Sequence, residues 1–576
     1  MSSPETKNVL EVDLTAQHWK RTARGDLAAH LGGIGLASGL FLEELRASRD
    51  VDRTFVLAVG PLSTIFPLAT KTAAVFRSPL TGEWGESYAG MRLAMALRFA
   101  GYDAVVVRGR SERPIYITIS SAGVRFHNAT ALWGLSVEEA GRRLREWERG
   151  RGHRSTMRIG PAGEKGIAFA GVNVDTFRHF GRLGLGAVMG GQNLKAVVVI
   201  GEQSQPIPNA REYRKVYDDI YRRAVTTDVM RKYHDLGTAQ NVLHLNELGA
   251  LPTRNLRYGS FEHAEKISGE AFARETLIRK LSCAGCPVGC IHVGLYRREF
   301  AEGYEYESET LAYDFELIYA LGSFLGLSRT ADVYALIDRV EQYGLDAISS
   351  GVVMGWATEA LARGIVSREE LQTDLAFGEV KGYLEFLDRL VEQSNDLYRT
   401  LGRGLQYAVG RLGGEDFACL HGGLEMAGYH TGYGALLGHS LGARHSHLCN
   451  AGYALDQDPE LSKRPEEMAG KLIAEEKWRN VLNSLCICLF ARSIYDPPTV
   501  RAALNAVGIA LEEADLQALG DCIFSLKLEA KRLLGFDWRG ITFSKRFFET
   551  PTPQGRLSLD VVQKLYAQYL RGIGKD

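Results

Sequence analysis

The pattern of apolar residues changes near residue 205, and this change limits the folds open to the 576-residue chain. Before it, short runs rich in β-branched residues, each bounded by Gly, Pro or Asp, predict strands at 55–59, 104–107, 115–119 and 196–200. After it, apolar residues recur every three or four positions, which predicts helices over 211–235, 329–343, 381–401, 466–483 and 514–534. The sequence therefore predicts an α+β fold, with a β-rich N-terminal domain followed by two mainly α-helical domains.

Two boundaries divide the chain into three predicted domains. A polar stretch with two prolines, 203–208, ends the β-rich domain, which we place at 1–205. A glycine- and histidine-rich stretch, 421–452, interrupts the helical pattern. We therefore place a second boundary just before it, which gives helical domains at 206–415 and 416–576.

Glycine is unusually frequent, with 63 in 576 residues, where an average protein has about 7%. Many of the glycines gather in two runs, 181–186 and 432–442. Because glycine has no Cβ, such runs permit tight turns and a close approach of the backbone to a bulky ligand.

Charge and hydropathy exclude several classes of partner. The formal net charge is −1, so no global positive field is available to hold nucleic acid or an anionic membrane surface. No segment reaches the roughly 18 apolar residues of a membrane span, and residues 1–13 are polar, unlike a signal peptide. We therefore expect a cytoplasmic protein that binds no nucleic acid and has no membrane span.

Three of the eight cysteines lie close together, as Cys283, Cys286 and Cys290 in a C-x2-C-x3-C array. Thiolates at this spacing can hold one metal centre, and glycines between them permit the turn. A [4Fe–4S] cluster needs four ligands, and Cys486 or Cys488 can supply the fourth. A structural zinc site uses similar spacing, and incidental thiols are the third alternative. The cluster is the interpretation that the array favours.

Short segments with a fixed order occur along the whole chain. They are G-P-L at 60–62, S-P-L-T-G at 78–82, F-A-G-Y-D at 99–103, I-G-P-A-G-E at 159–164, G-A-V-M-G at 186–190, N-L-K-A at 193–196, G-L-D at 344–346, C-L-F at 488–490 and K-R-F at 545–547. In order, spacing and coverage they resemble the aldehyde ferredoxin oxidoreductase family, tungsten–bis-pyranopterin enzymes with one [4Fe–4S] cluster. The resemblance implies an N-terminal domain that carries the cofactor as a saddle, with two helical domains over it.

The resemblance also implies which residues hold the cluster and the pterins. The family's D-x-x-G-L-C segment corresponds to Asn483 through Ile487 and Cys488, which makes Cys488 the fourth cluster ligand. The family's D-x-x-G-L-D segment corresponds to Glu341 through Asp346. The substitutions at Asn483 and Glu341 keep oxygen acceptors for the amine-rich pterin edge. Tungsten and molybdenum share the same ligands, so either metal fits.

Pterin phosphates require donors and a cation. Lys71 stands where the family commonly has arginine. Lysine keeps the positive charge but cannot form the bidentate hydrogen bonds of a guanidinium group. Arg178 and Arg182 flank a glycine-rich loop around Gly184 that offers backbone amides; surface salt bridges are the alternative role for the two arginines. Tyr88 falls where the family has an asparagine that contributes to Mg²⁺ binding, so a bridging Mg²⁺ is expected with altered details.

One histidine and one carboxylate are expected beside the metal, because burial can tune their pKa values for proton transfer. The resemblance points to His447 among the histidines of the 439–447 stretch. Two glutamates compete for the second role. Glu307 lies in a literal match to the family's E-Y-E-S, whereas Glu316 precedes the matching A-L-G by the family spacing. About nine residues are inserted between the two anchors, and the literal match slightly favours Glu307.

The resemblance implies an enzyme that oxidises a small organic substrate, an aldehyde, to a carboxylic acid and passes electrons to ferredoxin or an iron–sulfur partner subunit. The altered stretch 428–433 and the insertion at 308–317 leave open a reductive reaction with the same cofactor, on an aromatic acyl thioester or an acid. A non-catalytic electron-relay subunit is the alternative from another class. Either a homo-oligomer or a hetero-oligomer is compatible with the sequence.

Overall fold

The computed structural model describes residues 6–301, 303, 305–442, 447–448, 450 and 452–575. Helix makes up 47% of the structure and strand 18%, which confirms the α+β class. The chain forms two compact units. The sheet unit comprises Met1–Tyr233, Ser282–Gly289 and Lys477–Phe536, and the helical unit comprises His234–Leu281, Cys290–Glu476 and Asp537–Asp576. The domain ranges 1–205, 206–415 and 416–576 stay predictions.

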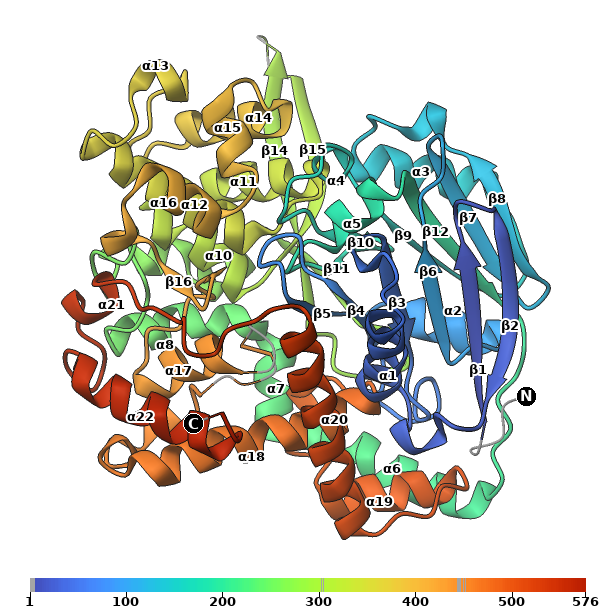
Figure 1. Ribbon diagram of the computed structural model, residues 1–576. Helices are drawn as coiled ribbons and strands as arrows, with labels where there is room; N and C mark the ends of the chain where they lie inside the picture. Colours follow the sequence, from blue (N-terminus) through green and yellow to red (C-terminus); the bar gives the residue numbers. More distant parts are fainter. Residues whose placement is uncertain are drawn as a thin grey trace. The chain divides into compact units, whose positions relative to one another are not determined.

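Two six-stranded sheets form the framework of the sheet unit (Figure 1). The first has the order β2-β1-β6-β3-β4-β5, and only its β1–β6 pair is parallel. Its strands are β1 (Lys7–Asp13), β2 (His18–Arg24), β3 (Thr54–Ala58), β4 (Thr72–Arg77), β5 (Trp84–Ala89) and β6 (Ala104–Arg108). Every residue of β3 is buried, as its continuous apolar run predicts.

The second sheet has the order β11-β10-β9-β12-β7-β8, with a parallel β12–β7 pair. Its strands are β7 (Ile115–Ser120), β8 (Gly123–Asn128), β9 (His153–Arg158), β10 (Val172–Val174), β11 (Arg178–Phe180) and β12 (Leu194–Gly201). β12 is buried along its whole length, including Lys195, whose ammonium group pairs with Glu164. The pairing offsets the cost of a buried charge in the centre of the sheet.

The helices of the sheet unit come from distant parts of the sequence. They are α1 (Gly33–Arg46), α2 (Leu93–Ala100), α3 (Val137–Trp147), α4 (Pro161–Glu164), α5 (Leu185–Gly191), α6 (Ala210–Thr226), α19 (Pro497–Ala506) and α20 (Glu513–Leu533). Two buried ion pairs join α20 to the first sheet: Lys527 lies 2.7 Å from Glu86, and Lys531 lies 2.9 Å from Glu83. Helix α20 is therefore part of the same core as the N-terminal strands.

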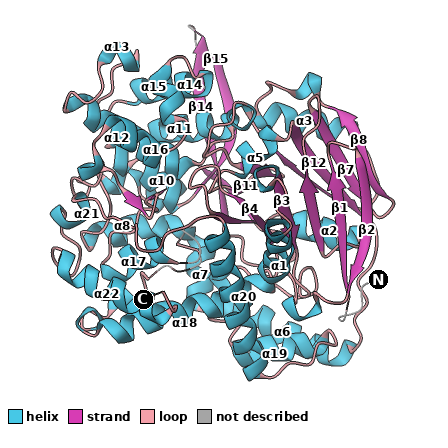
Figure 2. Ribbon diagram, in the orientation of Figure 1, coloured by secondary structure: helices cyan, strands magenta, loops and turns pink. Residues whose placement is uncertain are grey.

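Helices dominate the other unit (Figure 2). They are α8 (Asn241–Glu247), α9 (Gly269–Glu275), α10 (Phe315–Leu321), α11 (Thr330–Tyr343), α12 (Ala347–Ala362), α13 (Arg368–Leu371), α14 (Val380–Glu392), α15 (Asp396–Leu401), α16 (Leu405–Leu412), α17 (Tyr433–Leu441), α21 (Arg546–Glu549) and α22 (Leu559–Gly572). Helices α7 (Asp228–Asp235) and α18 (Pro465–Ser484) cross the boundaries between the units. The part of the chain described here contains no helix long and apolar enough to cross a membrane.

A sheet also occurs in the helical unit, which the sequence did not predict. Strands β13 (Leu277–Leu281), β14 (Ile291–Ala301) and β15 (Glu305–Tyr313) form an antiparallel sheet in sequence order, and β16 (Leu420–His421) pairs with β17 (Leu424–Glu425). The end of β15 and the first residues of α10 take up the stretch 308–317 that appeared as an insertion. This stretch lies between the E-Y-E-S match, in β15, and the A-L-G match, at the end of α10.

The predicted strands and helices are confirmed at their centres, and two predicted helices are interrupted. The helix expected at 211–235 divides into α6 and α7, and the one at 381–401 divides into α14 and α15. The second break has a clear cause. Gln393 adopts a left-handed φ of +56°, and Asn395 caps α15 by accepting a 3.1 Å hydrogen bond from the amide of Tyr398.

Candidate functional site

A single residue, Leu68, joins the two cysteine-bearing segments of the sheet unit. Its amide donates a 3.3 Å hydrogen bond to the carbonyl of Gly285, inside the cysteine array. Its carbonyl accepts a 2.8 Å hydrogen bond from the amide of Cys488. The array and the downstream cysteine, about two hundred residues apart in sequence, are thus fixed to the same loop.

The turn of the array depends on glycine at the predicted position. Gly285 has a left-handed φ of +78°, a conformation that costs other residues strain. The amide of Cys286 donates to the carbonyl of Cys283 at 3.0 Å, and Gly289 donates to the hydroxyl of Ser282 at 2.9 Å. Cys290 follows directly and is the first residue of its stretch of the helical unit.

The buried cysteines of the sheet unit differ in their electrostatic surroundings. Burial raises the pKa of Cys486 to about 12, and its thiol lies 3.8 Å from the carbonyl oxygen of Ala58. Burial also acts to raise the pKa of Cys283, but the charges of Lys71 and Arg178, together with hydrogen bonds to the Met91 backbone and the Thr70 side chain, leave that pKa lowered. Since thiolates are the metal-binding form, Cys283 is prepared for ligation and Cys486 is not.

Gly90 creates the space in which Cys283 meets these cations. A Cβ atom at position 90 would lie 2.5 Å from the sulfur of Cys283 and 3.6 Å from the Nζ atom of Lys71. It would also lie 3.7 Å from the Cγ atom of Arg178. The amide of Lys71 donates to the carbonyl of Cys486 at 3.1 Å. The structure therefore brings the predicted phosphate-binding cations Lys71 and Arg178 to the cysteine array.

The glycine-rich loop has a backbone that only glycine accommodates at position 184. Gly184 has a φ of +88°, and a Cβ there would lie 2.0 Å from the carbonyl oxygen of Ala168. The hydroxyl of Ser78 donates to the carbonyl of Leu183 at 2.8 Å, which anchors the loop on the S-P-L-T-G segment. Arg182, in the same loop, is 8% exposed. The loop is thus a preformed turn that follows two arginines, which is compatible with the predicted phosphate site.

The turn at the end of α18 packs against two glycines of the sheet unit. Asn483 accepts the 3.2 Å amide hydrogen bond of Cys486 on its carbonyl, and Ile487 donates to Leu482 at 3.1 Å. A Cβ at Gly33 would lie 2.3 Å from the Asn483 carbonyl oxygen, and one at Gly60 would lie 2.4 Å from that of Leu485. Asn483 and Ile487 are buried in this contact.

Tyr88 lies in β5, half-buried, and its hydroxyl donates a 3.1 Å hydrogen bond to Glu86. Glu86 is fully buried against Lys527. The hydroxyl of Tyr88 thus contacts the buried Glu86–Lys527 ion pair. The contribution of Tyr88 to Mg²⁺ binding stays a prediction.

In the helical unit, the 341–346 segment forms the turn between α11 and α12. Gly344 ends α11 with a left-handed φ of +72°. Asp346 begins α12 and accepts hydrogen bonds from the amide of Ile348 at 3.0 Å and from the hydroxyl of Ser349 at 2.6 Å. Glu341 lies half-buried in the last turn of α11. The turn therefore carries both predicted pterin-binding residues, and both carboxylate oxygens of Asp346 are engaged at the start of α12.

His447 and Glu316 lie together, and Tyr429 completes the cluster. The Nε2 atom of His447 is 3.4 Å from Oε1 of Glu316, and the hydroxyl of Tyr429 donates to that same oxygen at 2.7 Å. The rings of Tyr429 and His447 are 5.6 Å apart. Burial acts to raise the pKa of Glu316, yet the hydrogen bond and charge of His447 and the Tyr429 hydroxyl lower it overall.

Glu307 has different surroundings. It lies on the exposed strand β15, where its carboxylate forms a 2.6 Å ion pair with Arg298 and its side chain is 45% exposed. By comparison, the Glu316 side chain is 17% exposed. The contacts of the two glutamates therefore favour Glu316 as the carboxylate that works with His447, although the literal sequence match favoured Glu307. His445 lies outside the described residues.

Among the described residues, no three His, Cys, Asp or Glu side chains are grouped as a single metal ion requires. A four-iron cluster makes a different demand, because each of its thiolates binds a separate iron. The fixed loops and the lowered pKa of Cys283 fit that wider arrangement.

Sequence reasoning missed two contributors to these sites. Leu68 acts through its backbone, which no sequence motif records. Tyr429 lies in the stretch 428–433, whose departure from the family pattern was the available signal, but its partner Glu316 was not evident from the sequence.

Models of a known protein family match most of the chain. Residues 9–201 match the N-terminal domain of aldehyde ferredoxin oxidoreductase, and residues 215–574 match its domains 2 and 3. The chain therefore belongs to the aldehyde ferredoxin oxidoreductase family. It is an oxidoreductase enzyme, as the members of that family are.

Its relatives include several named proteins. It is 31% identical to the tungsten-containing aldehyde ferredoxin oxidoreductase of Thermococcus kodakarensis, over 95% of this chain and 92% of that one. It is 28% identical to the WOR-like subunit of an aliphatic sulfonate oxidoreductase of Pyrococcus furiosus, over 67% and 64% of the two chains. The fold matches the solved active-site complex BamBC of benzoyl coenzyme A reductase, with a TM-score of 0.84, 19% identity and coverage of 100% and 95%.

Proposed function

We propose that the protein is a tungsten–bis-pyranopterin oxidoreductase with one [4Fe–4S] cluster that oxidises an aldehyde to a carboxylic acid. The observation that carries the proposal is the pairing of His447 with Glu316, supported by the loop that joins Cys488 to the cysteine array. Family membership and the names of the relatives support tungsten and the aldehyde substrate.

The residues of the sheet unit suit the cofactors by their chemistry. Cys283, Cys286 and Cys488, with Cys290, would hold the cluster, while Lys71, Arg178, Arg182 and Asn483 would bind the pterin phosphates and ring edges. When bound, the metal centre supplies two-electron oxidation and the cluster supplies single-electron exit. A Mg²⁺ ion between pterin phosphates belongs to the same proposal, with molybdenum as the alternative metal.

The helical unit would supply the proton chemistry. Oxidation of an aldehyde takes up one water and releases two protons and two electrons. Glu316, with its lowered pKa, is ionised and able to accept a proton at Oε1. His447 faces that oxygen through Nε2, so the carboxylate holds the ring in orientation, and the other ring nitrogen, Nδ1, would polarise a substrate carbonyl when it carries a proton. Tyr429 fixes the same carboxylate from the other side.

Metal analysis of protein purified from its native host tests the proposal directly. We expect about four irons and one tungsten or molybdenum per chain, together with reduction of a viologen dye that depends on aldehyde and yields the acid. Protein that contains iron but no tungsten or molybdenum would favour an electron-relay subunit. Protein that contains only zinc would refute the redox assignment.

A further inference from the structure

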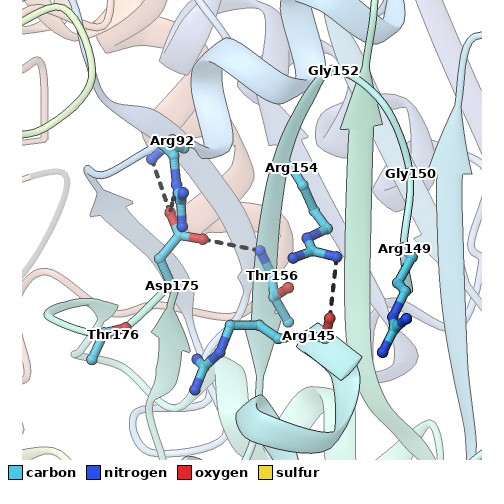
Figure 3. Close-up of a pocket in the computed structure, with 9 residues that line it drawn as sticks. All are labelled: Arg92, Arg145, Arg149, Gly150, Gly152, Arg154, Thr156, Asp175 and Thr176. Atoms are coloured by element: carbon cyan, nitrogen blue, oxygen red, sulfur yellow. Dashed lines mark hydrogen bonds and ion pairs between the residues drawn. The ribbon is translucent and has the colours of Figure 1, made fainter. Parts of the chain in front are cut away.

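An arginine-lined pocket of about 550 Å³ opens on the sheet unit, and its lining includes none of the residues assigned above. Its lining includes four arginines, Arg92, Arg145, Arg149 and Arg154, and a single carboxylate, Asp175. Figure 3 shows Arg92 joined to Asp175, with Arg145 and Arg154 near Thr156 and Arg149 beside Gly150 at the right of the view. The pocket is therefore strongly positive in a chain whose formal net charge is −1.

The one carboxylate of the lining is already engaged. Asp175 accepts from the amide of Arg92 at 3.1 Å, from its Nε at 3.3 Å, and from the Ser155 hydroxyl at 3.0 Å. Arg149 donates to the backbone carbonyl of Glu146 at 3.1 Å, a neutral acceptor. Arg145 and Arg149 are both exposed. Their positive charges thus face solvent.

Three consecutive residues connect this pocket to the cysteine array. Gly90 lies against the sulfur of Cys283, the carbonyl of Met91 accepts a 3.1 Å hydrogen bond from Ala284, and Arg92 lines the pocket. The side chain of Arg92 is 53% exposed. The pocket is thus a solvent-exposed, positively charged surface only two residues along the chain from the contact with Cys283.

We infer that this pocket is the docking site for an acidic iron–sulfur electron-carrier protein. The inference rests on the proposed function, since it needs a cluster at the cysteine array. A carrier must approach that array closely, and a local positive patch attracts an acidic protein and raises its rate of encounter. Exposed arginines around a concave surface suit carboxylates of such a partner, because each guanidinium can bind a carboxylate through two hydrogen bonds.

The electron balance is simple. Each turnover releases two electrons as one aldehyde and one water become one acid and two protons. Each docking event removes one electron from the enzyme and reduces one oxidised carrier, without a proton or a new bond. Two docking events therefore complete one turnover.

A double charge reversal, Arg145→Glu with Arg149→Glu, tests the inference on the whole enzyme. Binding to a purified acidic [4Fe–4S] ferredoxin is measured by calorimetry at low and high salt, and ferredoxin and viologen reduction are followed separately. The matched control is Arg110→Glu with Arg113→Glu, two exposed arginines. The control lies at the opposite end of β12 from the pocket. Ile115, which follows the two control arginines, pairs with Leu194 at one end of this strand, and Arg154 of the pocket pairs with Ile200 at the other.

We expect the pocket variant to bind ferredoxin at least tenfold more weakly at low salt, a range that electrostatic steering supports. Its viologen reduction should equal that of the wild type, and the control should bind within twofold of the wild type. Unchanged ferredoxin binding in the pocket variant overturns the inference. So does a variant that loses affinity for pyrophosphate while it keeps ferredoxin, because the pocket would then be a small-polyanion site. Absent viologen activity in the wild type refutes the proposed function instead, and the binding measurement still decides the docking site.

Discussion

The amide of Cys488 donates a 2.8 Å hydrogen bond to the carbonyl of Leu68. Cys486, two residues earlier, points into the core with a pKa raised by burial to about 12. Of these two cysteines, Cys488 is linked through Leu68 to the array at 283–290, whereas the thiol of Cys486 is buried in the core.

Cys488→Ser should lower the iron content and remove the cluster's visible absorption, because a hydroxyl is a poor replacement for a thiolate ligand. Cys486→Ser is the control. It should keep the full iron content and lose only stability, since it changes a buried group that binds no metal. Iron counting and the electron paramagnetic resonance signal of the reduced protein measure both. Equal loss of iron from the two variants would contradict the ligand assignment.

Glu316→Gln should reduce turnover by roughly a hundredfold or more while metal content stays intact, as expected for loss of a proton-transfer group. Glu307→Gln should leave turnover within about twofold of the wild type, because that side chain lies in an exposed ion pair with Arg298. Steady-state kinetics with a viologen acceptor provides the comparison. The reverse order of effects would restore Glu307 as the active carboxylate.

His430 predicts a loss of stability in acid. Burial lowers its pKa from 6.5 to about 4, and its Nε2 lies 2.9 Å from the carbonyl of Thr550. Between these values the unfolded chain takes up a proton that the folded protein does not, so stability is lost as the pH falls from 6.5 towards 4. The loss approaches about 3 kcal/mol, at about 1.36 kcal/mol per pKa unit.

The matched variant for this test is His430→Gln, which keeps an N–H donor and does not titrate. Urea unfolding at pH 7 and pH 4.5 should show a larger fall in the free energy of unfolding for the wild type than for the variant. Parallel behaviour of the two proteins across this range would exclude His430 as the source of the acid sensitivity.

Gly184→Ala should remove the phosphate-binding turn, because its Cβ would lie 2.0 Å from the carbonyl of Ala168. Gly134→Ala is a close control. Its φ of +89° matches the +88° of Gly184, but nothing lies within 4 Å of its Cβ position. The control should lose about 1–2 kcal/mol from the left-handed conformation alone. The Gly184 variant should lose more free energy of unfolding and contain less pterin and tungsten by mass spectrometry. Equal losses of stability in the two variants would show that the clash with Ala168 has no effect.

Much of this structure is predictable from local pattern. The buried runs of β3 and β12 and the periodic helices α11, α18 and α20 lie where their sequences place them. The sequence could not show how Cys488 is fixed relative to the cysteine array. The link consists of two hydrogen bonds made by the backbone of Leu68, one to Gly285 and one to Cys488. Side-chain patterns carry no record of such a bond.

The choice between Glu307 and Glu316 shows the second limit. The E-Y-E-S segment matches letter for letter, yet it forms a strand of an exposed hairpin in which Glu307 pairs with Arg298. Glu316 is favoured by its neighbours His447 and Tyr429, which lie more than a hundred residues downstream. Only tertiary structure shows that these three side chains meet.

The composition of the sheet unit has a consequence for synthesis on the ribosome. Glu86 is fully buried against Lys527, a residue made some 440 positions later. At about 5–20 residues per second, the N-terminal strands wait on the order of tens of seconds before that lysine emerges. During this interval a carboxylate and an apolar sheet surface lack their final cover. We expect the nascent chain to depend on chaperones for this period, and truncation before residue 513 to yield insoluble protein.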